Sequence, residues 1–146
     1  MTNLPKLKCI LFIDDDEPTN YLNRRLATQL DCAEKIITID QAEEALAYLK
    51  AMGQKEIPVP DLIFLDINMP QMNGWEFLDE YSDLDEDNKK SVIIIMLTTS
   101  LNPDDSERAK QYTEVNELKN KPLTLEMLRE VVEKYFASRT LVSSVH

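Results

Sequence analysis

The chain has 146 residues, of which 43% are hydrophobic and 29% are charged, so one compact domain with a single core is expected. Only two glycines are present, which excludes the glycine-rich phosphate loops of common nucleotide-binding folds. The formal net charge of −11 disfavours binding to nucleic acid, because no run of lysine or arginine is longer than a pair.

The cysteines and the N-terminus predict a cytoplasmic protein. Cys9 and Cys32 lie within or beside apolar segments without the spacing of metal ligands, so both are expected to be reduced, buried thiols. The N-terminus lacks the apolar core of a signal peptide, and no segment approaches the ~18 apolar residues of a membrane span. We therefore expect a chain in the cytoplasm, with neither membrane nor nucleic acid as a partner.

Strand-like and helix-like segments alternate along the chain. Strands are expected at residues 8–13, 35–39, 61–66, 91–97 and 114–118. Helices are expected at residues 18–30, 41–52, 73–81, 102–112 and 124–137, followed by a tail without clear periodicity at residues 138–146. A single domain is therefore predicted over residues 1–146, with its core at about residues 8–137.

Apolar residues predict which helix faces are buried. Leu22, Leu26 and Leu30 recur every four residues, so all three are expected to face the core. The second helix is expected to bury Ala42, Ala45, Leu46 and Leu49, and Gly53 lies where a helix C-cap belongs.

This alternation predicts an α/β fold in which five parallel strands form a doubly wound, flavodoxin-like sheet covered on both faces. Ligands of such sheets bind beyond the carboxyl ends of the strands. The residues expected at that edge are Asp14, Asp15 and Asp16 after the first strand, Asp66 after the third, Thr98 and Thr99 after the fourth, and Lys121 after the fifth.

The carboxylates at this edge predict a magnesium site. Carboxylate, carbonyl and water oxygens suit Mg²⁺, whereas zinc would want histidine or cysteine ligands, and the lone histidine, His146, is terminal. Two carboxylates about 5 Å apart repel by roughly 3 kcal/mol at an effective dielectric near 20. A cation or Lys121 is therefore needed to make the cluster tolerable.

A carboxylate in such a site can attack a phosphoryl group if positive charges neutralise the transferring oxygens. Asp66 is the best candidate nucleophile, because it ends a central strand and precedes a turn. Asp15 would then be a metal ligand, and Asp14 would bind the metal or its water.

These motifs resemble the receiver domain of two-component response regulators, the CheY-like family. They comprise Ile13-Asp14-Asp15, the nine residues from Asp66 to Gly74 (DINMPQMNG), Thr98, and Lys121-Pro122. Their order and spacing match the family over about residues 8–137, which is nearly the whole chain.

The resemblance implies a sheet in the order 2-1-3-4-5 and a role for each site residue. Asp66 is implied as phosphoacceptor, Thr98 as the hydroxyl that senses the phosphoryl group, and Lys121 as its counter-charge. The implied Mg²⁺ site comprises Asp15, Asp66 and the backbone carbonyl of Asn68, with Asp14 as acidic partner.

The resemblance also implies a phosphoacceptor rather than an enzyme acting on external substrates, although Mg²⁺ would assist its own phosphorylation and dephosphorylation. Because only nine residues follow Ala137, we expect a stand-alone receiver. The implied partners are a sensor histidine kinase or a His-containing phosphotransfer protein and an unidentified downstream protein. That target would bind the face formed by the fourth helix, fifth strand and fifth helix. The family commonly has an aromatic residue three positions before the lysine, where this chain has Leu118; Tyr112 is nearby in sequence.

Other conspicuous residues have structural interpretations. Asp16 and Glu17 fit charges at a helix N-terminus, and Gly74 with Met69-Pro70 fits turn geometry. Trp75 and Phe77 are expected to be packing or surface aromatics of the third helix rather than a binding platform, and residues 83–87 to form a solvated acidic loop.

Two alternatives from other classes stay open. A phosphatase of haloacid-dehalogenase type would use a D-x-D pair, which Asp14 and Asp16 formally supply, but such enzymes typically have a cap and no cap-sized insertion is present. A binding-only pseudo-receiver would ignore phosphate, a reading that Leu118 favours and the full acceptor set disfavours.

Overall fold

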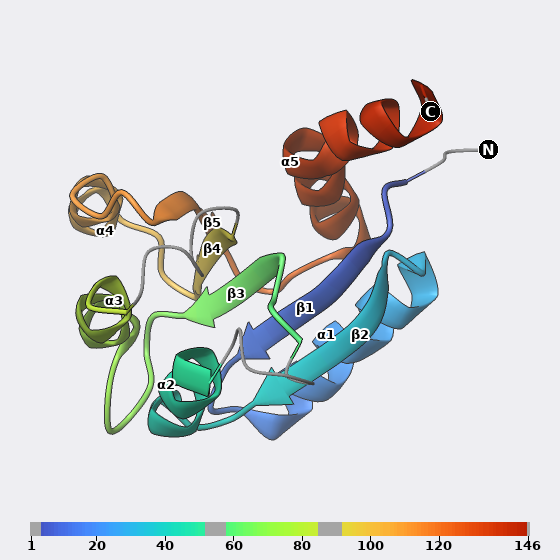
Figure 1. Cartoon of the computed structure of the whole chain (residues 1–146). Coiled ribbons are helices and arrows are strands. Elements are labelled where there is room, and N and C mark those ends of the chain that lie inside the picture. Colours follow the sequence, from blue (N-terminus) through green and yellow to red (C-terminus); the bar gives the residue numbers. More distant parts are fainter. Residues whose placement is uncertain (1–3, 52–57, 85–91, 146) are drawn as a thin grey trace.

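This computed structural model describes residues 4–51, 58–84 and 92–145 (Figure 1). Strands and helices alternate along them as the sequence predicts. The strands are β1 (Leu7–Ile13), β2 (Ala33–Ile39), β3 (Leu62–Asp66), β4 (Ile93–Thr98) and β5 (Val115–Asn120). The helices are α1 (Glu17–Leu30), α2 (Ala42–Ala51), α3 (Gly74–Ser82), α4 (Pro103–Ala109) and α5 (Leu125–Val145).

The five strands form one parallel sheet in the order β2-β1-β3-β4-β5, which confirms the predicted flavodoxin-like topology. The register aligns the carboxyl ends of the central strands: Ile13 pairs with Leu65, and Asp66 pairs with Leu97. Residues that leave these strands therefore start from one edge of the sheet.

Both faces of the sheet are buried under helices. Along β1, Leu11 and Ile13 join a buried cluster with α2 and α3, while Ile10 and Phe12 join a second cluster with α1 and α5. The Phe12 ring stacks on Phe64 of β3 with centroids 5.3 Å apart. This double burial explains why β1, β3 and β4 are continuous apolar runs in the sequence.

Side-chain caps fix where the helices near the carboxyl edge begin. Asp16 caps α1 by accepting a hydrogen bond from the Thr19 amide at 3.0 Å, which confirms its interpretation as a helix-terminal charge. Asn73 and Glu76 form a capping box at the start of α3. Asn102 caps α4 and so holds the end of the β4–α4 loop.

The predicted buried face of α1 is wrong at Leu22. Leu22 is 57% exposed, and the residues of α1 that are buried are Asn20, Asn23 and Ala27. Each step of four residues turns the side chain about 40° around a helix axis, so a row spaced by four drifts across the surface. Leu26 and Leu30 therefore reach the core as half-buried residues, whereas Leu22 faces solvent.

Other boundaries differ less. The four inward residues predicted for α2 are all buried, but α4 ends at Ala109, short of the predicted end at Tyr112. Residues 138–145, predicted as an irregular tail, continue α5 as helix to Val145. The predicted cap at Gly53 and most of the acidic segment 83–87 lie outside the described residues. Over the described ranges, no helix combines the length and apolarity needed to span a bilayer.

Candidate functional site

Asp14 occupies the first position after β1, and its peptide and carboxylate are both held. Its backbone amide donates to the Ile39 carbonyl at 3.1 Å, which extends the β1–β2 pairing by one residue. Its carboxylate Oδ1 accepts a hydrogen bond from the Asp16 amide at 2.9 Å, and Oδ2 lies 2.6 Å from Lys121 Nζ. This buried carboxylate therefore has a fixed direction.

Asp66 is the last residue of β3 and is also buried. Its Oδ1 atom lies 3.1 Å from Lys121 Nζ and 3.3 Å from the Asn68 amide nitrogen, which donates to it. Behind it, the Gly74 amide donates to the Ile67 carbonyl at 2.7 Å. A Cβ atom on Gly74 would lie only 2.8 Å from the Asp66 carbonyl oxygen, so this close approach requires glycine.

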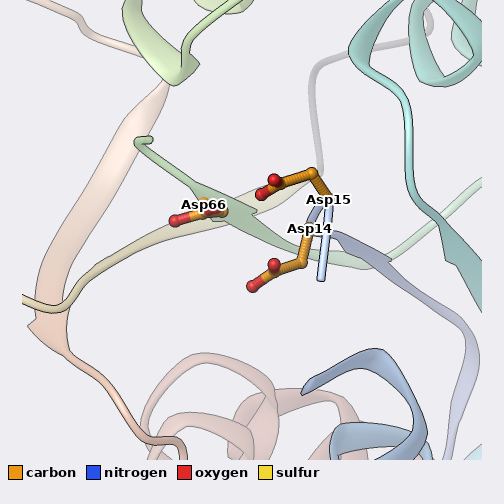
Figure 2. Close-up of side chains that lie close together, drawn as sticks. All are labelled: Asp14, Asp15 and Asp66. Atoms are coloured by element: carbon orange, nitrogen blue, oxygen red, sulfur yellow. The ribbon is translucent and has the colours of Figure 1, made fainter. Parts of the chain in front are cut away.

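Asp15 completes a cluster of three carboxylates. One carboxylate oxygen each from Asp14, Asp15 and Asp66 can be chosen so that all lie within 4.8 Å of one another. Figure 2 shows the three side chains pointing into the same space from the ends of β1 and β3. Asp15 is exposed, whereas the other two are buried, so the cluster opens to solvent on the Asp15 side.

Lys121 directly follows the edge strand β5 and brings a positive charge to this cluster. Its backbone amide donates to the Thr98 carbonyl at 2.7 Å, which fixes the residue to the end of β4. Burial by itself would lower the pKa of the ammonium, but the hydrogen bonds and charges of Asp14 and Asp66 outweigh it and leave this pKa raised. Lys121 is therefore fully charged at neutral pH.

Asp66 has an unusual acidity for a carboxylate. Burial raises its pKa, and the neighbouring negative charge of Asp14 raises it further. Lys121 opposes both effects, and the resulting pKa is about 6. Asp66 therefore changes protonation just below neutral pH, in the range where active-site carboxylates are often tuned.

A cavity of about 470 Å³ lies over the cluster. Its lining residues are Asp14, Asp15, Asp16, Thr19, Asp66, Asn68, Thr99, Lys121 and Pro122. Thr98 is not among them: it is buried at the end of β4, and its hydroxyl oxygen accepts a hydrogen bond from the Ser100 amide at 3.1 Å. The structure therefore brings every predicted site residue to the cavity wall except Thr98, which is buried at the end of β4 beside the lining residue Thr99.

Aromatic side chains of α3 and of the segment after α4 pack near the predicted site. Trp75 and Phe77 are buried, which confirms their interpretation as packing residues. Tyr112 stacks on Trp75 with centroids 5.6 Å apart and donates a hydrogen bond to Asp79 of α3 at 2.9 Å. Leu118, at the position where the family commonly has an aromatic residue, is half-buried against the same core cluster.

Asn20 is a site neighbour that the sequence pattern did not predict. Its side-chain amide donates to the Asp14 carbonyl at 2.8 Å from the buried face of α1. Hydrophobic periodicity assigns buried faces to apolar residues, so it has no signal for a buried polar contact. A hint was available only in the spacing, because Asn20 lies one helical turn into α1 and so faces back toward the acidic turn.

The donor set fits a hard divalent cation. All side-chain donors in the cluster are carboxylate oxygens, and Asn68 also lines the cavity above them. Within the described residues, Lys121 contacts Asp14 and Asp66, whereas Asp15 has no ion-pair partner. The three carboxylates thus exceed the local positive charge, which favours a bound cation.

Comparison with known proteins decides the family. Residues 10–133 match the family model of the response regulator receiver domain. The chain belongs to that family. Receiver domains are signalling domains, and this response regulator has the CheY-like fold and an acidic pocket of the kind at which such domains generally bind Mg²⁺.

Individual relatives agree with this assignment. The receiver is 31% identical over 105 residues to response regulator Rcp1 of Synechocystis, covering 71% of this chain and 69% of that protein. A crystal structure of a two-component response regulator from Cytophaga hutchinsonii is 32% identical with a TM-score of 0.78, covering 90% of this chain and 98% of the other. The crystal structure of the phosphorylated cyanobacterial phytochrome response regulator RcpA is 28% identical with a TM-score of 0.72, covering 90% and 96%.

Proposed function

We propose that this receiver accepts a phosphoryl group on Asp66 and signals by a phosphorylation-dependent change in protein binding. The donor is a phosphohistidine on a sensor histidine kinase or on a His-containing phosphotransfer protein, as family membership suggests. The observation that carries the proposal is the position of the Asp66 carboxylate at the end of a central strand, beside two further carboxylates and the ammonium of Lys121.

The transfer needs an ionised carboxylate oxygen at the wall of the cavity, where Asp66 lies, and positive charge around the phosphoryl group. One carboxylate oxygen of Asp66 attacks phosphorus; the new P–O bond forms as the P–N bond to the donor histidine breaks. The imidazole leaves with the bonding electron pair and takes a proton from solvent. With a pKa of about 6, Asp66 is mostly ionised at pH 7.5. Lys121, 3.1 Å from Asp66 Oδ1, stabilises charge on the transferring oxygens.

Asp14, Asp15, Asp66 and the Asn68 carbonyl would hold Mg²⁺ beside this oxygen. When bound, the cation supplies positive charge that neutralises both the cluster and the phosphoryl oxygens. The geometric support is the convergence of the three carboxylates, and the electrostatic support is the single lysine against three negative charges.

The switch would start at Thr98 and Lys121. Phosphorylation adds about −1.5 to −2 charges at Asp66, which attract the Lys121 ammonium and the Thr98 hydroxyl. Because the Thr98 hydroxyl oxygen accepts a hydrogen bond from the Ser100 amide, movement of this hydroxyl toward the phosphoryl group would pull on the β4–α4 loop. Helix α4 buries none of its residues, so it can shift at little cost in packing.

Tyr112 offers an aromatic contact that Leu118 cannot. Its ring and its hydroxyl tie the end of α4 to Trp75 and Asp79 of α3, and Trp75 follows the glycine that touches the Asp66 carbonyl. The guanidinium of Arg108 in α4 also lies over the Trp75 ring, 5.0 Å from its centroid. We propose that movement of α4 alters this contact and changes the α4–β5–α5 face to which a downstream protein binds.

The cysteines support a cytoplasmic location for this signalling role. Cys9 and Cys32 are free and buried, and burial raises the pKa of each thiol to about 11. Both are therefore protonated, unreactive thiols at neutral pH, as suits a reducing compartment.

Incubation with Mg²⁺ and acetyl phosphate tests the proposal by intact mass. The wild type should gain one phosphate, Asp66→Asn should gain none, and Asp83→Asn, a change at an exposed carboxylate at the end of α3, should gain one. No gain in the folded wild type would contradict the proposal and favour a binding-only domain. Steady release of inorganic phosphate from a generic phosphomonoester would instead favour the phosphatase alternative.

A further inference from the structure

Asn20 is a polar residue at a position where burial of its side chain lowers the stability of the fold. It is 6% exposed on the face of α1 that packs against the sheet, where an apolar side chain would be expected. Its Oδ1 atom is buried and makes no hydrogen bond to the described residues. A buried polar atom without a partner is destabilising, so some other contact of this side chain must favour asparagine.

That contact is to the acidic turn itself. The Nδ2 group of Asn20 donates to the Asp14 carbonyl at 2.8 Å, at the point where β1 has ended and the sheet can no longer pair that carbonyl. The backbone amide of Asn20 also donates to the Asp16 carbonyl at 3.1 Å. One residue of α1 therefore closes the turn at both its first and its third aspartate.

Both backbone polar groups of Asp14 are then fixed. Its amide is bonded to Ile39 of β2, and its carbonyl is bonded to Asn20 of α1. Because the backbone direction at residue 14 sets where the Asp14 and Asp15 side chains leave the chain, this arrangement holds two like charges in the cluster against their mutual repulsion. Partners that orient ligands in this way commonly alter metal affinity about tenfold or more when they are removed.

We propose that Asn20 is a positioning residue of the phosphorylation site, holding the Asp14–Asp16 turn so that the Asp14 and Asp15 carboxylates converge with Asp66. The inference rests on the proposed function for its Mg²⁺ readout, but the position of the turn can be measured without any metal.

The test compares Asn20→Leu with Asn23→Leu. Both replace a buried asparagine on the same face of α1, and Asn23 lies one turn further from the acidic turn. Isothermal titration calorimetry with Mg²⁺ should show about tenfold weaker binding for Asn20→Leu and wild-type affinity within about twofold for Asn23→Leu. Thermal unfolding should show no greater loss of stability for Asn20→Leu than for Asn23→Leu, because the first change also removes a buried, unpartnered oxygen.

A metal-free readout separates this proposal from the proposed function. Amide hydrogen exchange at Asp16 should accelerate in Asn20→Leu and not in Asn23→Leu, because the Asp16 amide donates to Asp14 Oδ1. Unchanged exchange at Asp16 together with wild-type Mg²⁺ affinity would overturn the proposal. Absence of Mg²⁺ binding by the wild type would count against the proposed function alone, and the exchange result would still decide the role of Asn20. If Asn20→Leu does not fold, Asn20→Ser serves for both measurements.

Discussion

Lys121 Nζ lies 2.6 Å from Asp14 Oδ2, in an ion pair whose side chains are 13% and 4% exposed. The same ammonium also reaches Asp66, so one positive charge from the end of β5 serves two carboxylates from β1 and β3. A buried ion pair is sensitive to the loss of one partner, because the remaining charge stays desolvated. The stability of this receiver and its chemistry are therefore linked at Lys121.

Lys121→Met should lower the free energy of unfolding by about 3 kcal/mol in the absence of divalent cations, because Asp14 and Asp66 would face each other uncompensated. Urea unfolding at pH 7.5 measures this change. Lys110→Met is the control: Lys110 pairs with Glu107 on the surface, both side chains being 73% exposed, and its loss should cost less than about 1 kcal/mol. Equal effects of the two substitutions would contradict the role assigned to the buried pair.

The pKa of Asp66 predicts a pH dependence of stability. The pKa is about 6 in the folded protein, whereas an aspartate in an unfolded chain titrates near 4. The folded state therefore binds this proton more tightly, so the stability contributed by Asp66 is complete below about pH 4 and is lost as the pH rises through about 6.

Asp66→Asn removes that titration. Relative to the wild type, the variant should gain roughly 2 kcal/mol of unfolding free energy as the pH is raised from 4 to 7.5. Urea unfolding of both proteins across this range, without divalent cations, measures the difference. A difference that does not change with pH would show that Asp66 titrates normally.

Mg²⁺ should stabilise the wild type, because binding to the folded state alone shifts the equilibrium by mass action. At a hundredfold excess over its dissociation constant, the expected gain is about 2.7 kcal/mol. Asp15→Asn should lose most of this gain while folding normally, since Asp15 is exposed and has no ion-pair partner among the described residues. Thermal unfolding with and without Mg²⁺ provides the comparison, and an undiminished gain in Asp15→Asn would remove Asp15 from the metal site.

Trp75 should report the switch. It is the one tryptophan in the chain, and its buried ring contacts both Arg108 of α4 and Tyr112. Loading with Mg²⁺ and beryllofluoride should change its emission and its quenching by acrylamide, and Thr98→Val should prevent the change while still binding the mimic. Fluorine NMR establishes occupancy in both proteins. An unchanged Trp75 signal in the loaded wild type would contradict the proposal that phosphorylation moves α4.

Much of this molecule could be predicted from sequence because its apolar pattern is unusually simple. Strands buried on both faces, such as β3 and β4, appear as unbroken apolar runs, and their carboxyl ends identify Asp66 and the neighbourhood of Thr98. The convergence of Asp14, Asp15 and Lys121 then follows from parallel topology, whereas the cap at Asp16 follows from the local signal of acidic residues at a helix start.

The remaining features depend on contacts that no local pattern encodes. Leu22 fits an apolar row yet is exposed, because a row spaced by four drifts around the helix, and the face of α1 that is buried includes the polar residues Asn20 and Asn23. The direction of the Thr98 hydroxyl depends on the Ser100 amide in the following loop. The Trp75–Tyr112 stack joins α3 to the segment that follows α4, and these parts lie far apart in the chain, so neither residue signals the contact alone.

The most direct test of the central claim is to locate the phosphate after reaction with phosphoramidate and Mg²⁺, since this small donor transfers its phosphoryl group from nitrogen as phosphohistidine does. Borohydride reduction of the acyl phosphate followed by peptide mapping identifies the modified residue. We predict modification at Asp66 alone in the wild type and none in Asp66→Asn. Modification at Asp14 or Asp15, or of the Asp66→Asn variant to the same extent, would contradict the account.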